Sequence, residues 1–89
     1  MDDTVILGHL EALADTLGIQ IRYESMEGDA GFSTGGLCRV RNKQYIIVNA
    51  RATMREKVNT LSGSLRRFDL SHIYIRPALR YLLAPADEE

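Results

Sequence analysis

The chain has 89 residues, a length that suits one small domain and excludes two. Hydrophobic residues make up 45% and charged residues 26%, which is the composition of a soluble globular domain rather than of a disordered or fibrous chain. No apolar run approaches the ~20 residues of a membrane span, so we expect no contact with a membrane. The single cysteine, Cys38, excludes an internal disulfide and predicts a reducing, cytoplasmic location.

The net charge of -1 hides an uneven distribution along the chain. Residues 1–29 carry seven acidic side chains and one basic side chain, whereas residues 30–86 carry ten basic and two acidic ones, and residues 87–89 are all acidic. Such asymmetry is typical of a basic face for an anionic partner, or of an acidic first third that packs beside a basic remainder.

The first third of the chain predicts a helix followed by a strand. Apolar residues recur at spacings of four, three and four over residues 6–17, which predicts a helix from about 4 to 17. Asp3 or Thr4 can cap its start, and Gly18 suits its end. Residues 19–24 then alternate between apolar and polar, which predicts a strand with one buried face. The polar, glycine-containing residues 25–35 predict a mobile loop.

The middle of the chain predicts two strands joined by a tight turn. The strands cover residues 37–41 and 44–50, with Asn42-Lys43 at the turn. Cys38 and Val40 share one face of the first strand, which we interpret as the core face. Residues 45–48 are apolar on both faces, which predicts that the second strand lies at the centre of the sheet.

A second amphipathic helix is predicted over residues 54–67. Thr53 and Glu56 have the spacing of a capping box, in which each side chain bonds the backbone of the other residue. Apolar residues then repeat at four, three, four and three. Gly63 interrupts this helix, and its place on the helix favours an exposed position over a close contact with a partner. Gly63→Ala is then expected to stabilise the protein.

The C-terminal residues predict a strand and a short helix. Residues 73–75 have the alternation of a short edge strand, and Pro77 suits the first turn of a last helix over 77–83. The whole chain, residues 1–89, therefore predicts a single α+β domain in the order α-β-β-β-α-β-α. We expect a mainly antiparallel sheet with helices on one face, and disorder at residues 1–3 and 85–89.

Residues that could perform chemistry are few and scattered. His9, Cys38 and His72 lie on different elements and lack the paired spacing of zinc ligands, so we expect neither a metal nor a cofactor. On the core face, Cys38 is typical of a small buried hydrophobe rather than of a nucleophile. No residues form the pattern of an acid, a base and a nucleophile, so we predict no catalytic residue and no enzyme.

Two surfaces are candidates for binding. An apolar stripe near the C-terminus either packs within its own molecule or pairs with a second copy across a two-fold axis. Its members are Ile73, Tyr74, Ile75, Leu79, Leu82 and Leu83. Nine arginines against two lysines favour bidentate binding of phosphate or another anion. The candidate ligands for an anion or a nucleic acid are Arg39, Arg41, Arg55, Arg66 and Arg67.

Three segments follow each other in a recognisable order: Leu10–Ile21, a hairpin that ends Ile46-Ile47-Val48-Asn49, and Arg55–Phe68. In order and spacing they resemble the zinc-peptidase family typified by ImmA and IrrE. The resemblance implies a scaffold of helix, strand, hairpin and helix. It implies neither zinc binding nor peptide hydrolysis, because the family's two histidines and its glutamate fall on Gly63, Arg67 and Ser64 here. The chain also resembles small bacterial proteins of unknown function, which implies no activity.

The sequence therefore predicts a non-catalytic protein-interaction or regulatory module that self-associates as a homodimer or binds another protein. The alternative is a binder of nucleic acid or of another anionic ligand through an arginine-rich face. The arginines lie on different elements rather than along one stripe, which makes nucleic acid the less favoured partner.

Overall fold

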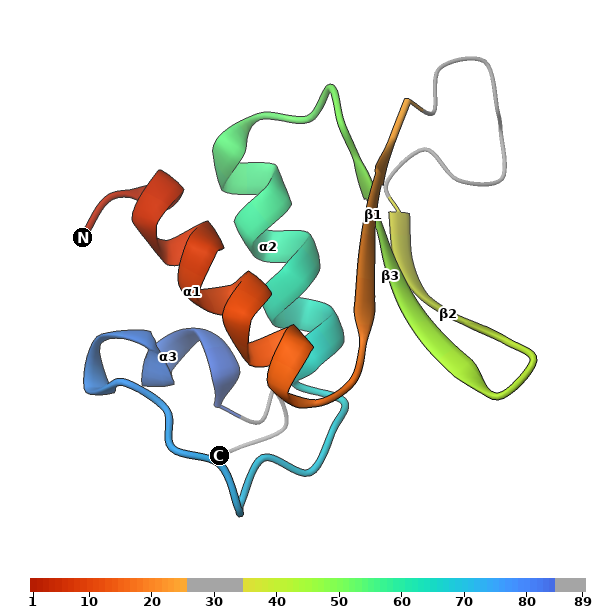
Figure 1. Cartoon of the computed structure of the whole chain (residues 1–89). Coiled ribbons are helices and arrows are strands. Elements are labelled where there is room, and N and C mark those ends of the chain that lie inside the picture. The colour runs from red at the N-terminus through yellow and green to blue at the C-terminus, as the bar shows by residue number, and fades with distance from the viewer. Residues whose placement is uncertain (26–34, 85–89) are drawn as a thin grey trace.

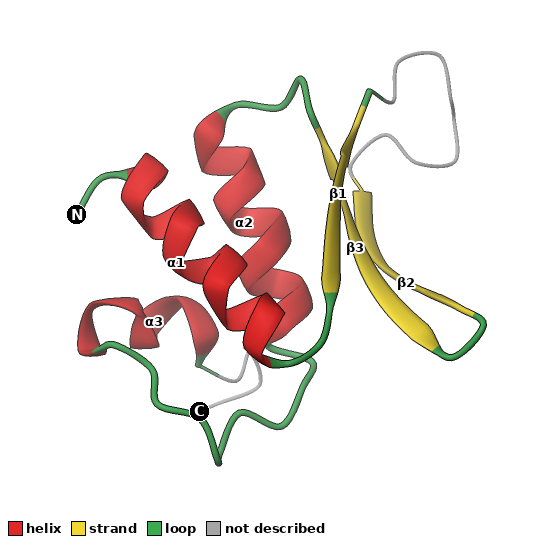
Figure 2. Cartoon of the chain, viewed as in Figure 1, coloured by secondary structure: helices red, strands yellow, loops and turns green. Residues whose placement is uncertain are grey.

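The protein is a layer of helices packed against a small sheet. The computed structural model describes residues 1–25 and 35–84, and within them the helices lie on one side of the sheet (Figure 1; Figure 2). The helices are α1 (Asp3–Thr16), α2 (Met54–Leu65) and the short α3 (Arg80–Leu83), which a 3-10 turn at Pro77–Leu79 precedes. The strands are β1 (Gln20–Glu24), β2 (Gly35–Val40) and β3 (Lys43–Asn49). The predicted α+β class is confirmed.

The described sheet is mixed, with strand order β1-β3-β2. β3 lies at its centre, as the apolar residues on both faces of this strand predict. β2 and β3 form the antiparallel hairpin, with Leu37 opposite Ile46. β1 pairs with β3 in parallel, with Gln20 opposite Tyr45, so the expectation of a mainly antiparallel sheet is wrong. Alternation in a sequence reports which face a side chain occupies, but it carries no information on strand direction.

Residues 73–75 are not an edge strand, because they pair with no strand of the described sheet. The chain turns before them: the Asp69 carboxylate accepts hydrogen bonds from the Ser71 N–H and hydroxyl, at 3.0 and 2.7 Å. These two bonds hold the pKa of Asp69 below its usual value. Ile75 then packs against the hydrophobic core. The apolar alternation therefore reflects an extended segment docked on helices rather than a ladder of hydrogen bonds.

Capping explains where the two long helices begin. The Asp2 carboxylate accepts a hydrogen bond from the Val5 N–H at 3.1 Å, so the cap lies one residue before the predicted pair, and Asp2 and Asp3 belong to the helix start rather than to a disordered end. In α2 the predicted capping box is confirmed, since Thr53 accepts from the Glu56 N–H and Glu56 accepts from the Thr53 N–H. Each such cap stabilises a helix by ~1 kcal/mol.

The hairpin turn lies one residue earlier than predicted, at Arg41-Asn42. Both residues have positive φ, 51° and 68°, which is the geometry of a two-residue turn that matches the twist of its strands. Asn42 tolerates this conformation well, whereas Arg41 does so at some cost. The predicted loop over 25–35 and the predicted disorder of 85–89 fall almost entirely outside the described residues.

The core lies between the helices and one face of the sheet. Its most enclosed side chains come from α1, β3 and α2: Leu10, Ile46, Val48, Val58, Leu61 and Leu65. The C-terminal leucines Leu79, Leu82 and Leu83 complete it. None of the helices in residues 1–25 and 35–84 has both the length and the apolar character required to cross a membrane.

Candidate functional site

The side of the sheet that faces away from the helices carries apolar side chains. Ile46 and Val48 are buried toward the helices, so Tyr45 and Ile47, which alternate with them, point to the other side. Cys38 lies opposite Tyr45 in the antiparallel pair and shares that side. We call this surface the open sheet face and define it by Arg22, Cys38, Val40, Tyr45 and Ile47.

The prediction that Cys38 and Val40 lie on the core face of their strand is wrong. Leu37, not Cys38, packs against the core, and Val40 is 48% exposed, so the face of β2 assigned to the core is the outer one. The charges of Arg39 and Arg41 favoured an outward position for their side of the strand. Arg39 shares a side with Leu37 but stays exposed, because it lies near the end of the strand. Cys38 is half-buried on the open sheet face and is therefore not a fully buried hydrophobe.

Charged side chains flank the apolar centre of this face. The Arg22 guanidinium lies 5.9 Å from the centre of the Tyr45 ring and 3.0 Å from the Glu24 carboxylate. An arginine over an aromatic face is a favourable contact, worth ~0.5–1 kcal/mol at exposed sites. The surface thus combines an aromatic and aliphatic centre with a polar edge, which is the usual composition of a protein interface.

Val40 and Ile47 are not among the binding residues predicted from the sequence. The signal was present, since residues 45–48 are apolar on both faces. That pattern placed β3 correctly at the centre of the sheet. It also implied that the second face needs a cover, and no described helix or strand packs on that side (Figure 1).

A second cluster joins β1 to the helices. The Tyr23 hydroxyl donates a hydrogen bond to the Glu11 carboxylate of α1, and the Lys57 ammonium of α2 lies 5.7 Å from the centre of the Tyr23 ring. Burial, and then the hydrogen bond to Glu11 and its charge, raise the pKa of Tyr23 well above its ordinary value. These contacts connect the edge strand β1 to both α1 and α2.

This raised pKa predicts how Tyr23 contributes to stability as the pH changes. The folded protein holds the Tyr23 proton more tightly than the unfolded chain, so the contribution is complete below about pH 10 and is lost as the pH rises above it. We expect Tyr23→Phe to lower the free energy of unfolding by about 0.5–1 kcal/mol at neutral pH. The difference from the wild type should shrink above about pH 10 in urea unfolding.

Tyr74→Phe is the control for that measurement, because Tyr74 is exposed and makes no hydrogen bond within the described part of the chain. Its difference from the wild type should be small and independent of pH. A Tyr23→Phe difference that stays constant across this pH range would contradict the assignment.

The five candidate arginines do not form one surface. Arg55, in the first turn of α2, forms an ion pair with Asp3 of α1 at 3.3 Å. Arg66 follows the other end of α2 and donates a hydrogen bond to the Leu82 carbonyl at 3.1 Å. A helix of that length separates its two ends by roughly 17 Å. Arg39 and Arg41 belong to the hairpin, and Arg67 follows Arg66. The structure therefore disperses this set.

Most of the proposed self-association stripe lies inside the molecule. Leu79, Leu82 and Leu83 belong to the core, and Ile73 and Ile75 are half-buried. Tyr74 alone is largely exposed, at 76%. The structure thus follows the alternative in which the stripe packs within its own molecule, which leaves Tyr74 as its one open member.

No metal site is formed by the described residues: within 1–25 and 35–84, no three His, Cys, Asp or Glu side chains are grouped as ligands. The positions at which the zinc-peptidase family has its ligands hold a half-buried glycine, a buried serine and an exposed arginine, namely Gly63, Ser64 and Arg67.

A hollow of about 420 Å³ lies where α1 ends beside the hairpin, and Gln20, Lys43, Gln44 and Phe68 are among its lining residues. The Gln44 Oε1 atom is buried and has no hydrogen-bond partner in the described structure, which is a destabilising feature. Because that atom is enclosed, a molecule in the hollow cannot reach it without moving the side chain. The hollow therefore adds nothing to the case for a ligand.

Comparisons with known proteins provide no further assignment. No family model, no curated protein and no solved structure matches the chain.

Proposed function

We propose that the protein is a non-catalytic interaction module that forms a homodimer through the open sheet face. The supporting observation is the one-sided cover of the sheet: the described helices pack on one side, and Tyr45, Ile47 and Val40 lie on the other. Two sheets pack face to face at ~10 Å, with side chains from both inner faces forming a core.

A second copy suits this face because the face complements itself. Its centre is apolar, and its edge carries both a positive group, Arg22, and a negative group, Glu24. Across a two-fold axis the same patch meets its own copy, so each Arg22 can pair with the Glu24 of the other molecule. A strongly basic or acidic partner would instead leave one of these charges without a counterpart.

Val40→Lys tests the proposed dimer. We expect the wild type to show a species of twice 10.0 kDa in sedimentation equilibrium at high micromolar concentration. The variant places an ammonium group in the apolar contact and should weaken dimerisation by about tenfold or more.

Val5→Lys is the matched control, since Val5 is 47% exposed against 48% for Val40 and lies on α1, on the other side of the sheet. It should leave the dimerisation constant unchanged. A wild type that remains at 10.0 kDa at high micromolar concentration, or equal weakening by both substitutions, would overturn the proposal.

The location that we propose is the cytoplasm. The observation that supports it is the single cysteine, since Cys38 has no internal partner for a disulfide and lies half-buried on the proposed contact surface. A thiol is compatible with an interface that forms and dissociates in a reducing compartment.

A further inference from the structure

A groove between α1 and the extended segment 73–76 combines apolar and cationic groups. It has a volume of about 320 Å³, and its lining includes His9, Leu13, Tyr74, Arg76 and Leu79. This volume is at the lower end of the range for pockets that hold small ligands or single nucleotides. The floor is aliphatic, and the rim carries an imidazole, a guanidinium and a phenol ring.

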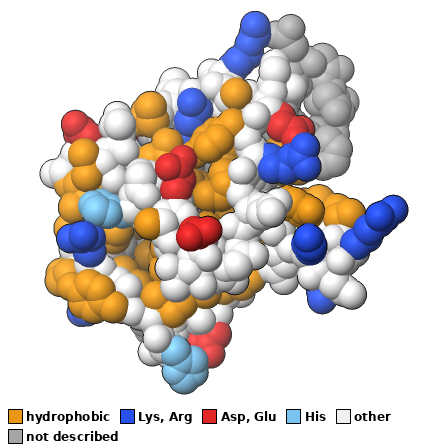
Figure 3. All heavy atoms as spheres, in the orientation of Figure 1, with side chains coloured by type: hydrophobic (Ala, Val, Ile, Leu, Met, Phe, Trp, Pro, Cys, Tyr) orange, Lys and Arg blue, Asp and Glu red, His pale blue; other side chains and the backbone are white. Residues whose placement is uncertain are grey.

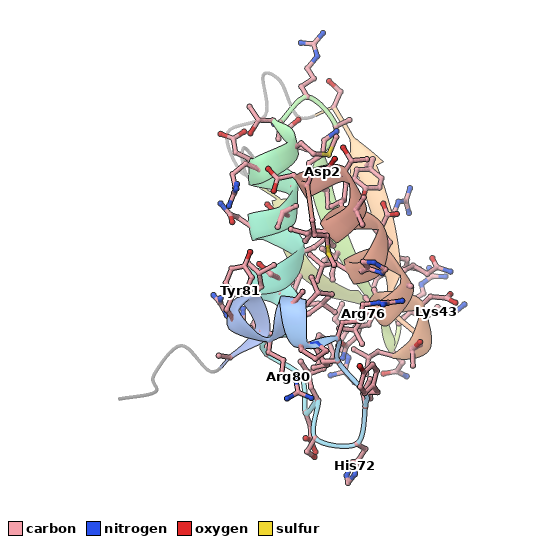
Figure 4. All side chains as sticks on the ribbon, turned by 90° about the vertical axis from the view of Figure 1, so that its left-hand side faces the viewer. Asp2, Lys43, His72, Arg76, Arg80 and Tyr81 are labelled. Atoms are coloured by element: carbon pink, nitrogen blue, oxygen red, sulfur yellow. The ribbon has the colours of Figure 1, made fainter. Side chains whose placement is uncertain are left out.

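The charge along this segment has one sign. Residues 71–84 contain two arginines and one histidine but no Asp or Glu. The Arg76 guanidinium makes no ion pair or hydrogen bond within the described structure, and the Arg80 Nε atom donates to the Ile75 carbonyl at 3.3 Å. That bond keeps Arg80 beside the groove, while its remaining N–H groups stay available. Figure 4 shows Arg76 and Arg80 on one side of the molecule, together with Tyr81 of α3.

Two tyrosines are unusually open on this surface. Tyr74 is 76% exposed and Tyr81 is 66% exposed, although tyrosine normally buries most of its ring. Figure 3 shows hydrophobic side chains next to Lys or Arg and one His at the left of the view, whereas the His at the bottom of the view has an acidic side chain beside it. Exposed aromatic rings interleaved with cations are the arrangement on which unpaired bases stack.

The segment that carries these groups is fixed before any ligand binds. Leu79, Leu82 and Leu83 anchor it in the core, and the Arg66 guanidinium donates to the Leu82 carbonyl at 3.1 Å. Little conformational entropy is therefore lost when a ligand contacts the exposed side chains. Packing alone does not explain why a backbone that is anchored in the core presents exposed tyrosine rings and guanidinium groups.

We propose that this groove binds single-stranded nucleic acid. One base stacks on Tyr74, and the adjacent phosphates pair with the guanidinium groups of Arg76 and Arg80, which present forked donors to phosphate oxygens. A single strand fits better than a duplex because the bases of a duplex are stacked on each other and cannot reach a tyrosine ring. An acidic peptide would pair with the guanidinium groups, but it would not account for the exposed tyrosine rings.

The proposal is independent of the dimer. The groove lies on the helical side, whereas the proposed dimer contact is the open sheet face on the opposite side (Figure 1). Val40→Lys should therefore bind an oligonucleotide as the wild type does, whether or not the wild type dimerises. Failure of one proposal can be distinguished from failure of the other.

The test is fluorescence anisotropy of the full chain with a labelled oligouridylate and a labelled oligothymidylate. We expect binding that weakens steeply between about 50 and about 200 mM salt, because bound phosphates release counterions. Tyr74→Ala should weaken binding by about fivefold or more. Arg76→Gln should weaken it and reduce the slope of log affinity against log salt by about 0.7.

Arg39→Gln is the matched control, because it removes an arginine that is also exposed but belongs to the hairpin, away from the groove. It should leave affinity within about twofold. The proposal is overturned if no oligonucleotide binds at low salt, or if Arg39→Gln weakens binding as much as Arg76→Gln. It is also overturned if a polyglutamate peptide competes fully and Tyr74→Ala has no effect, which would identify an acidic peptide as the ligand. Circular dichroism of each variant confirms that the fold is intact.

Discussion

Leu79→Ala is expected to lower the free energy of unfolding by about 2–4 kcal/mol, the usual cost of a cavity in a hydrophobic core. Leu79 is 4% exposed and belongs to the cluster that joins α1, α2 and the sheet. The free energy of unfolding of a whole domain is about 5–15 kcal/mol, so the variant should lose a large part of its stability. Urea unfolding followed by circular dichroism measures the change.

Tyr81→Ala is the matched substitution, two residues further along and 66% exposed. It should change the free energy of unfolding by no more than about 0.5 kcal/mol.

The same two variants distinguish a core position from an interface position. Replacing a core leucine lowers the free energy of unfolding by the same amount at low and high protein concentration. Replacing a leucine at a dimer contact lowers it more as the concentration rises. A concentration-dependent loss in Leu79→Ala would contradict its place in the core.

Gly18→Ala and Gly63→Ala are expected to change stability in opposite directions. Gly18 follows α1 with φ +78°, a left-handed conformation that costs a residue with a side chain about 1–2 kcal/mol. Apart from its two neighbours in the chain, no atom of the described residues lies within 4 Å of a Cβ placed there, so the loss is conformational. Gly63 is half-buried rather than exposed. Outside the backbone of its own helix, a Cβ there meets, among the described residues, the Arg66 Nη2 atom at 3.9 Å, which is an ordinary contact. Alanine should therefore stabilise α2 by up to ~1 kcal/mol.

Thermal denaturation measures both effects, with a shift of about 4–8 °C for each kcal/mol in a domain of this size. The two variants carry the same chemical change, so each serves as the control for the other. A lower midpoint for Gly63→Ala would mean that a Cβ on that side of α2 meets a close contact, such as that of a partner molecule.

The helices were predictable because their signals are local. The capping box at Thr53 and Glu56 and the 3.6-residue repeat of α2 determine one element without reference to the rest of the chain. β3 was also predictable as the central strand, because it is apolar on both faces. The direction of β1 and the absence of a strand at residues 73–75 depend on which segments meet in space, and local periodicity does not encode that.

The candidate site was harder to predict for a related reason. Cys38 and Leu37 are adjacent residues of similar burial preference, and only the register with β3 decides which of them faces the helices. The arginines were visible in the sequence, but their grouping was not: Arg55 pairs with Asp3, and Arg66 bonds the Leu82 carbonyl. Arg80 lies beside the segment that carries Arg76 because its Nε atom donates to the carbonyl of Ile75, two residues before Pro77.

The parallel pairing of β1 with β3 has a consequence for the order of folding. The hairpin closes between Val40 and Lys43 and continues into α2, so most contacts in this part of the chain join near neighbours. β1 instead meets a partner far along the sequence, as in the pair Gln20 and Tyr45. The entropy of closing that long loop opposes early pairing. We therefore infer that hairpin and α2 assemble first, and that α1 and β1 dock last on a surface already formed.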